Sequence, residues 1–219
     1  IILEDDCLPD QSFFSFASTM LERYRGDELV MAVRGTNLQF GEIVDANRAN
    51  NNQSAEGNIE APAYYFSRSP HIWGWATWRR AWQKYDIEMN DLDEFVQSGI
   101  IHEMFPDQKV SNFWISIFKH VRNRKVDTWD TQWAYTIIKS EGLSVVPNVN
   151  LIENIGIGTD ATHTTTGPDF LKQPAGSISD LGFAHYPPPI STSSVSSEIS
   201  QTDMGADLRE MRLLYILPL

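Results

Sequence analysis

The stretch Ile1–Pro9 constrains the fold more than any other part of this chain. Three apolar residues, Ile1–Leu3, are followed at once by Glu4, Asp5 and Asp6 and then by a Leu-Pro turn. This order is typical of a buried parallel strand that ends at the carboxyl edge of a sheet, where open α/β folds bind their ligands. Because side chains alternate along a strand, we expect Glu4 and Asp6 on one side and Asp5 on the other. The stretch therefore predicts an α/β fold.

The paired carboxylates of Glu4 and Asp6 suit a hard divalent cation. Mg²⁺ and Mn²⁺ take oxygen ligands and commonly bind through one or two carboxylates, while waters and substrate phosphates fill the other positions. The pattern thus favours a metal-bridged phosphate site. A solvated acidic strand end, or a helix cap at Asp6 or Asp10, explains the same acids equally well, so both interpretations stay open at this point.

Composition narrows the class of protein. The chain has 219 residues, 42% of them hydrophobic and 21% charged, as expected for one globular domain with a substantial core. Its net charge of -12 gives no electrostatic reason to bind nucleic acid. The single cysteine, Cys7, excludes an internal disulfide and a cysteine-based zinc site and is compatible with a reducing compartment. The sequence contains no long apolar span, so we expect no integral membrane segment and a cytoplasmic location, which includes peripheral attachment at the inner membrane.

Hydrophobic spacing predicts alternating helices and strands. Helices are expected over residues 11–25, 77–85, 86–107, 112–122 and 127–138, and strands over residues 29–33, 63–68 and 143–147. Residues 41–62 are polar and rich in asparagine, which predicts a long surface loop. Proline, serine and glycine accumulate from Pro174 onward, so we expect one domain over residues 1–173 and a flexible tail over residues 174–219.

Four tryptophans lie between positions 73 and 82. Trp78 and Trp82 have helical spacing and are expected to pack inward. Trp73 and Trp75 flank Gly74, a residue type that permits the close approach of a ligand or unusual dihedral angles. Because indole rings stack on sugars and bases, these three residues are candidates for substrate binding. The alternative is that the whole block is a tryptophan-rich wedge of the core.

Two further residues are candidates for chemistry. Asp130 lies between Trp129 and Trp133 at the start of an expected helix, a place that suits a catalytic base or a ligand for an acceptor hydroxyl. The alternative is that Asp130 caps the helix. His163, in a polar loop punctuated by glycines, is either an exposed loop histidine or the residue that completes a metal site begun by Asp6.

Four motifs together carry a family resemblance. They are Leu3–Cys7 followed by a proline and a Phe-rich helix, the block Trp73–Trp82, the segment Trp129–Trp133, and the loop Asn154–His163. In this combination the chain resembles the carboxy-terminal half of GT-A nucleotide-sugar glycosyltransferases. It is similar in particular to bacterial family-two-like transferases of the hemolytic protein HlpA-like group. The resemblance covers about residues 1–170 of the chain.

The resemblance implies a GT-A-like α/β fold and a hexosyltransferase that moves a sugar from a nucleotide-diphosphate donor to the hydroxyl of a glycan or other acceptor. In such an enzyme Asp6 and His163 hold Mn²⁺ or Mg²⁺ on the donor diphosphate, and Glu4 and Asp5 orient the ribose or metal-bound water. Asp130 is implied as the base that deprotonates the acceptor.

The same resemblance implies a substrate-binding role for Trp73, Gly74, Trp75 and Trp129 beside the acceptor. In this family a βαβ region that binds the nucleotide base precedes the acidic motif, so we expect that half to be missing before Ile1. We therefore predict no tight binding of a UDP-sugar or GDP-sugar until it is supplied. Two other classes stay open: a non-catalytic carbohydrate-binding or interaction module, and a metal-dependent phosphoesterase.

Overall fold

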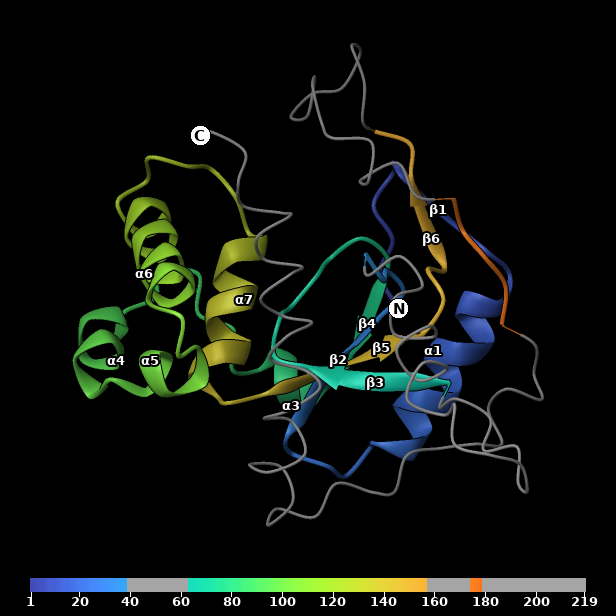
Figure 1. Ribbon diagram of the computed structural model, residues 1–219, viewed down its shortest axis with the longest axis horizontal. Coiled ribbons are helices and arrows are strands. Elements are labelled where there is room, and N and C mark those ends of the chain that lie inside the picture. The colour runs from blue at the N-terminus through green and yellow to red at the C-terminus, as the bar shows by residue number, and fades with distance from the viewer. Residues whose placement is uncertain (39–62, 157–173, 179–219) are drawn as a thin grey trace, which may run out of the picture.

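The computed structural model describes residues 1–38, 63–156 and 174–178 as a mixture of helices and strands (Figure 1). The elements, in chain order, are β1 (Cys7–Pro9), α1 (Ser12–Arg23), β2 (Val30–Arg34), β3 (Tyr64–Ser67), β4 (Trp75–Thr77), α3 (Arg79–Trp82), α4 (Leu92–Ser98), α5 (Ile100–Met104), α6 (Gln108–Arg122), α7 (Asp130–Lys139), β5 (Leu143–Pro147) and β6 (Ile152–Asn154). The expected α/β class is confirmed at this level.

The main sheet is mixed and has the strand order β3-β5-β2-β4. Strands β2 and β5 run parallel, whereas β4 and β3 pair antiparallel with β2 and β5 respectively. All five residues of β2 are buried, as expected for a strand with neighbours on both sides and helices on both faces. Val30 and Val33 belong to the core cluster formed with α1, whereas Met31 and Ala32 belong to the cluster formed with α3 and α7.

Helix α1 covers one face of this sheet, as its spacing predicts. Phe13, Phe16, Ala17 and Met20 recur at intervals of three and four residues, so they share one helix face, and all four are buried. Asp10 lies two residues before the helix, and its Oδ1 accepts a hydrogen bond from the backbone N–H of Ser12, the first helical residue, at 2.9 Å.

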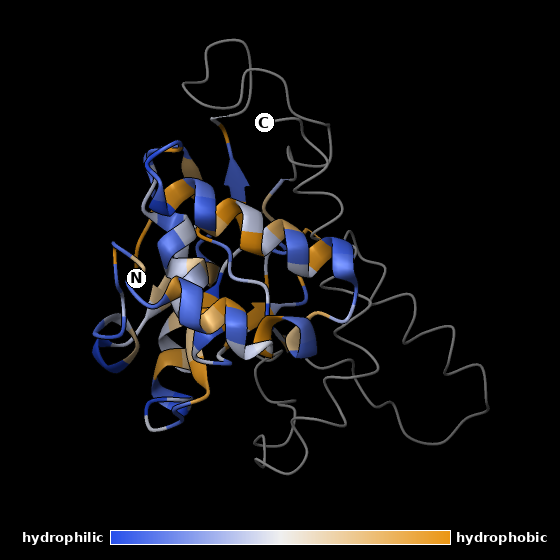
Figure 2. Cartoon of the chain, turned by 90° about the vertical axis from the view of Figure 1, so that its left-hand side faces the viewer, coloured by the Kyte–Doolittle hydropathy of each residue, from blue (hydrophilic) through white to orange (hydrophobic). Residues whose placement is uncertain are grey.

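Helices α4, α5, α6 and α7 form a lobe beside the sheet with a core of its own (Figure 1). Hydrophobic and polar residues alternate along these helices, as Figure 2 shows, because each helix has one apolar face that packs against its neighbours. One helix was expected over residues 86–107, but Gly99 divides it into α4 and α5. Its φ of +79° is a left-handed conformation that ends a helix and that glycine adopts without strain.

The expectation of a buried parallel strand over Ile1–Leu3 is wrong. The side chains of Ile1, Ile2 and Leu3 are 50%, 38% and 37% exposed. Only an isolated antiparallel bridge joins Ile2 to Trp75, with hydrogen bonds of 2.7 Å and 3.0 Å between their backbones. The apolar run is too short to pair further before the acids that follow it force a turn into solvent.

The expected flexible tail does not begin at residue 174. Residues 174–178 are described and lie on the core: the N–H of Ile178 donates to Ser12 Oγ at 3.1 Å, and its side chain is buried. The remainder of the expected tail and the expected loop over residues 41–62 lie outside the described residues. None of the helices in the described ranges is long and apolar enough to cross a bilayer.

Candidate active site

The acidic motif forms a turn instead of a strand end. The N–H of Cys7 donates to the carbonyl of Glu4 at 3.1 Å and so closes a turn through Asp5 and Asp6. Glu4 and Asp6 are half-buried, whereas Asp5 is exposed. Ligand atoms of Glu4, Asp6 and Cys7 lie within 4.8 Å of one another. The predicted separation of Glu4 and Asp6 from Asp5 is thus observed, although a turn produces it and strand alternation does not.

Strand β6 holds this acidic turn in place. Strand β1 pairs antiparallel with β6, so that Cys7 lies opposite Asn154, and the N–H of Ile155 donates to the carbonyl of Asp6 at 2.8 Å. The next residue, Gly156, lies directly against the Asp6 side chain, because a Cβ there would be 2.3 Å from Asp6 Oδ2. Only a residue without a side chain permits this contact, so Gly156 fixes where the Asp6 carboxylate lies.

The electrostatics of the acidic turn show an excess of negative charge. Burial raises the pKa of Glu4 to about 6, and the charges of Asp6, Asp130 and Asp5 contribute in the same direction. The contribution of Asp130 indicates that this residue, far away in the sequence, lies near enough to act on Glu4 through its charge. Such crowding of carboxylates is relieved by a bound cation.

The donor atoms in the turn fit a hard metal ion. Glu4 and Asp6 offer carboxylate oxygens, which Mn²⁺ and Mg²⁺ prefer. Burial raises the pKa of the Cys7 thiol to about 12, so the thiol carries its proton at neutral pH. His163, the other predicted ligand, lies outside the described residues.

Asp130 is the first residue of α7, and its two carboxylate oxygens differ. Oδ1 accepts hydrogen bonds from the hydroxyl of Thr128 and from both the N–H and the hydroxyl of Thr131. Among the described residues Oδ2 accepts none. Local hydrogen bonds therefore fix the orientation of the carboxylate and leave one oxygen available to a ligand, an arrangement that suits a proton acceptor.

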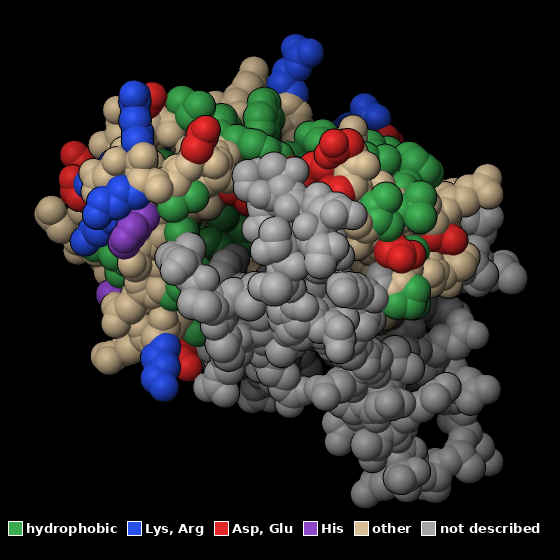
Figure 3. All heavy atoms as spheres, turned by 90° about the horizontal axis from the view of Figure 1, so that it is seen from above, with side chains coloured by type: hydrophobic (Ala, Val, Ile, Leu, Met, Phe, Trp, Pro, Cys, Tyr) green, Lys and Arg blue, Asp and Glu red, His purple; other side chains and the backbone are tan. Residues whose placement is uncertain are grey.

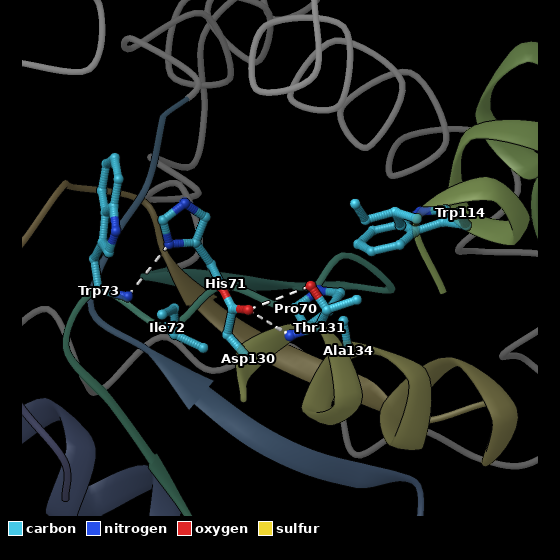
Figure 4. A pocket seen from close by; sticks show the side chains of 9 residues that line it. Pro70, His71, Ile72, Trp73, Trp114, Asp130, Thr131 and Ala134 are labelled. Atoms are coloured by element: carbon cyan, nitrogen blue, oxygen red, sulfur yellow. Dashed lines mark hydrogen bonds between the residues drawn. The ribbon is translucent and has the colours of Figure 1, made fainter. Parts of the chain in front are cut away.

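A pocket of about 200 Å³ opens beside Asp130. Figure 4 shows His71 and Trp73 on one side, Trp114 on the other, and Asp130 with Thr131 between them. Ile117 also lines it. Seen from above, acidic side chains stand at several separate places among hydrophobic ones (Figure 3). The pocket thus combines a carboxylate with apolar walls, as binding sites for small polar molecules commonly do.

The structure separates the two tryptophans of the Trp-Gly-Trp sequence. Trp73 is half-buried and lines the pocket, as its candidate role requires. Trp75 is 0% exposed and packs against Trp133 and Trp82, with ring centroids 5.4 Å and 6.0 Å apart. The interpretation of Trp75 as a substrate-binding residue is therefore wrong: it is core. Conversely, Trp82, expected inside, is 40% exposed.

Gly74 does have the unusual dihedral angles that its position suggested, with a φ of +63°. The group that approaches it is not a ligand. A Cβ at Gly74 would lie 2.4 Å from Ile152 Cδ1, and the residue is buried. Gly74 therefore makes room for strand β6. The prediction that Gly74 binds substrate is wrong, as it is for Trp75, because both residues are buried in the core.

Trp129 remains exposed next to Asp130. Its ring is stacked on Trp75 at 6.1 Å with an interplanar angle of 24°, and its side chain is 37% exposed. The hydroxyl of Tyr85 donates to the Trp129 carbonyl at 3.0 Å. Burial, and then the charges of Asp130 and Asp86, raise the pKa of Tyr85.

Three pocket residues carry no clear signal in the sequence. Trp114 and Ile117 fit the apolar pattern of an amphipathic helix, and only the tertiary arrangement shows that part of their surface lines a pocket. For His71 the sequence offers one weak indication, its position two residues before the candidate residue Trp73. The acidic turn does not itself line this pocket. The charge of Asp130, which does line it, contributes to the raised pKa of Glu4 in the turn.

Comparisons with protein-family models, with curated proteins and with solved structures found no match for this chain.

Proposed function

We propose that this protein is a metal-dependent glycosyltransferase of the GT-A type, which transfers a sugar from a nucleotide-diphosphate donor to an acceptor hydroxyl. One observation carries the proposal: Trp75 pairs through its backbone with Ile2, just before the acidic turn, and stacks its ring on Trp129, just before Asp130 at the edge of an apolar-walled pocket. A carboxylate pair for a metal-bound diphosphate and a carboxylate base for a hydroxyl are then neighbours. The mixed sheet between helices is compatible with this fold.

In the proposed reaction Asp130 Oδ2 takes the proton of the acceptor hydroxyl while the hydroxyl oxygen bonds to the anomeric carbon of the donor sugar. The bond between that carbon and the diphosphate oxygen breaks, and its electron pair leaves with the nucleoside diphosphate. Glu4 and Asp6 would hold the Mn²⁺ or Mg²⁺ ion, which when bound offsets the charge that develops on the diphosphate. Thr128 and Thr131 keep the base oriented through Oδ1.

The walls of the pocket suit a saccharide acceptor. Trp73 and Trp114 offer apolar surfaces for the C–H faces of a sugar ring. Trp129, which precedes Asp130 in the chain, adds an exposed aromatic ring. Asp5, exposed on the same turn, stays a candidate contact for the donor ribose. We place the reaction in the cytoplasm, where the Cys7 thiol stays reduced.

The test is donor turnover by the full-length protein. We expect Mn²⁺-dependent release of nucleoside diphosphate from a UDP-sugar or GDP-sugar. Asp6→Ala should lower turnover at least 100-fold at unchanged helix content, because a charged leaving group loses its counterion. Glu22→Gln, an exposed carboxylate on α1, is the matched control and should turn over normally. Metal-independent turnover, or an Asp6→Ala variant as active as the wild type, would refute the proposal.

A non-catalytic carbohydrate-binding module is the second candidate. It is favoured by the exposed aromatic surface in which Trp82 stacks on Tyr85 at 4.7 Å with an interplanar angle of 8°. If this candidate is right, saccharide binding is lost in Trp82→Ala, is unchanged in Asp6→Ala and Asp130→Asn, and no donor is turned over.

A further inference from the structure

Gln132 is a buried glutamine in the first turn of α7, and it bonds to the segment that leads into Asp130. Its side chain is 5% exposed, and its Nε2–H donates to the backbone carbonyl of Thr128 at 2.7 Å. A backbone carbonyl only accepts hydrogen bonds, so the atom that faces it is the amide nitrogen, and the orientation of the side-chain amide is defined. Gln132 therefore joins the helix to a residue that lies two positions before the helix begins.

This contact reaches Asp130 through Thr128. The Thr128 hydroxyl donates to Asp130 Oδ1, which also accepts hydrogen bonds from the N–H of Thr131 at 2.5 Å and from its hydroxyl at 3.3 Å (Figure 4 shows the two bonds to Thr131). Thr131 follows Asp130 directly on the same helix, whereas Thr128 lies outside it. The Thr128 hydroxyl can thus restrain the Asp130 carboxylate from outside the helix only while Thr128 itself is held, and Gln132 supplies a bond that holds it.

Packing alone does not explain an amide at position 132. Within the part of the chain that the structure describes, Gln132 Oε1 is buried and accepts no hydrogen bond. A buried polar atom without a partner opposes folding, and a methionine would fill a similar space without this cost. A methionine, however, offers no donor to the Thr128 carbonyl. The contact with Thr128 therefore accounts for the amide better than stability does.

A second donor secures the next residue of the same segment. The hydroxyl of Tyr85 donates to the carbonyl of Trp129 at 3.0 Å. Two consecutive carbonyls before Asp130 are thus bonded to side chains, one from α7 itself and one from the chain that follows α3. Because Tyr85 still holds the main chain at Trp129 when the Gln132 amide is removed, we expect such a change to act on Thr128 and the Asp130 carboxylate and to leave the rest of the segment in place.

We propose that Gln132 is a positioning residue for Asp130. Through Thr128 it keeps Oδ1 occupied and so leaves Oδ2, which accepts no hydrogen bond from the described residues, as the oxygen that takes the proton of the acceptor hydroxyl. Gln132 itself contacts neither substrate nor metal. The inference rests on the proposed transferase function for the proton transfer, whereas the chain of hydrogen bonds from Gln132 to Asp130 does not depend on that function.

The first arm of the experiment observes the hydrogen bonds and needs no substrate. The dipeptide Asp-Thr occurs twice in this sequence, at residues 127–128 and 130–131. Labelling with carbonyl-¹³C aspartate and ¹⁵N threonine therefore selects the amides of Thr128 and Thr131 in a carbonyl-filtered NMR spectrum, and Thr128→Val assigns them by removing one signal. Gln132→Met should move the Thr131 amide proton upfield, because its charge-assisted bond to Asp130 weakens. Gln97→Met, which changes an exposed glutamine on α4, is the control and should leave both signals in place.

The second arm measures Mn²⁺-dependent turnover of a UDP-sugar or GDP-sugar by the full-length protein. Gln132→Met should lower kcat about tenfold or more and leave the KM for the donor within about twofold, because only the base is displaced. Thr128→Val should have the same effect. Since Gln132 acts through Thr128, the variant that carries both changes should lose no more than Thr128→Val alone, whereas independent effects would multiply.

An unmoved Thr131 signal in folded Gln132→Met, or multiplied losses in the double variant, would overturn the inference. If circular dichroism shows that Gln132→Met does not fold, Gln132→Asn replaces it with the same expectations, because its amide is one methylene too short to reach Thr128. Failure of the transferase proposal looks different: the Thr131 signal would depend on Gln132 while Mn²⁺-dependent turnover is absent. If turnover depends on Asp6 but is normal in Gln132→Met, the transferase proposal stands and this inference fails.

Discussion

Replacing Gly156 with alanine tests the acidic turn without touching any carboxylate. The new Cβ would lie 2.3 Å from Oδ2, 2.7 Å from Cβ and 2.9 Å from Cγ of Asp6. Non-bonded heavy atoms prefer about 3.5–4.0 Å, so the Asp6 side chain must retreat by roughly 1 Å. Rotation of the carboxylate alone is insufficient, because the Asp6 Cβ is also too close. Gly156 has no positive φ, so alanine adds no backbone strain and the effect stays local.

A metal ligand displaced by about 1 Å loses roughly 10- to 100-fold in affinity, or about 1.4–2.7 kcal/mol. We therefore expect Gly156→Ala to bind Mn²⁺ 10- to 100-fold more weakly in an electron paramagnetic resonance titration with the metal alone. Overpacking should cost at most about 1–3 kcal/mol of folding stability, so circular dichroism should show a folded protein. Gly26→Ala is the control, since a Cβ at Gly26 meets nothing within 4 Å. An unchanged Mn²⁺ affinity in folded Gly156→Ala would refute the placement of the metal at Asp6.

Three further predictions concern stability, measured by urea unfolding. Trp75→Ala should lose about 3–5 kcal/mol because its indole is fully buried, whereas Trp129→Ala, whose ring is 37% exposed, should lose about 1 kcal/mol; equal losses would contradict the assignment of Trp75 to the core. Because the pKa of His71 is lowered in the folded protein, the unfolded chain binds more protons than the folded protein below pH 6.5. Stability should therefore fall with decreasing pH in this range, by at most about 1.4 kcal/mol per pH unit. His71→Gln should flatten this slope. Asp91→Asn should lose about 1 kcal/mol of folding stability at pH 7. Burial opposes ionisation of Asp91, but hydrogen bonds from Lys139 and Tyr135 outweigh it and lower the pKa of Asp91. The difference between the variant and the wild type should therefore shrink as the pH falls below about 4.

Local patterns predicted most helices and strands. The spacing of Phe13, Phe16 and Met20 places them on one helix face, and the uninterrupted apolar run of β2 marks a strand buried on both sides. Both signals are local, so the sequence alone contains them. The division at Gly99 was missed because a glycine inside a helical pattern is compatible with both a continuous and a broken helix.

The site was harder to predict, because its parts depend on tertiary contacts. The convergence of Glu4 and Asp6 was expected from alternation, but a turn and the pairing of β1 with β6 produce it. Neighbouring tryptophans have opposite roles: Trp73 lines the pocket and Trp75 is core, and no composition rule distinguishes them. A strand alternates its side chains between its two faces, but which face is covered depends on helices α3 and α7.

The burial of Trp75 explains how two distant parts of the candidate site keep their relative position. Its backbone pairs with Ile2, two residues before Glu4, through hydrogen bonds of 2.7 Å and 3.0 Å. Its ring packs against Trp129 and Trp133, which flank Asp130. One residue thus contacts the segments on both sides of the site, through its main chain and its side chain respectively. Because close-packed rings tolerate little displacement, the separation between the acidic turn and the Asp130 carboxylate is fixed by this core residue without any direct contact between Trp75 and a ligand.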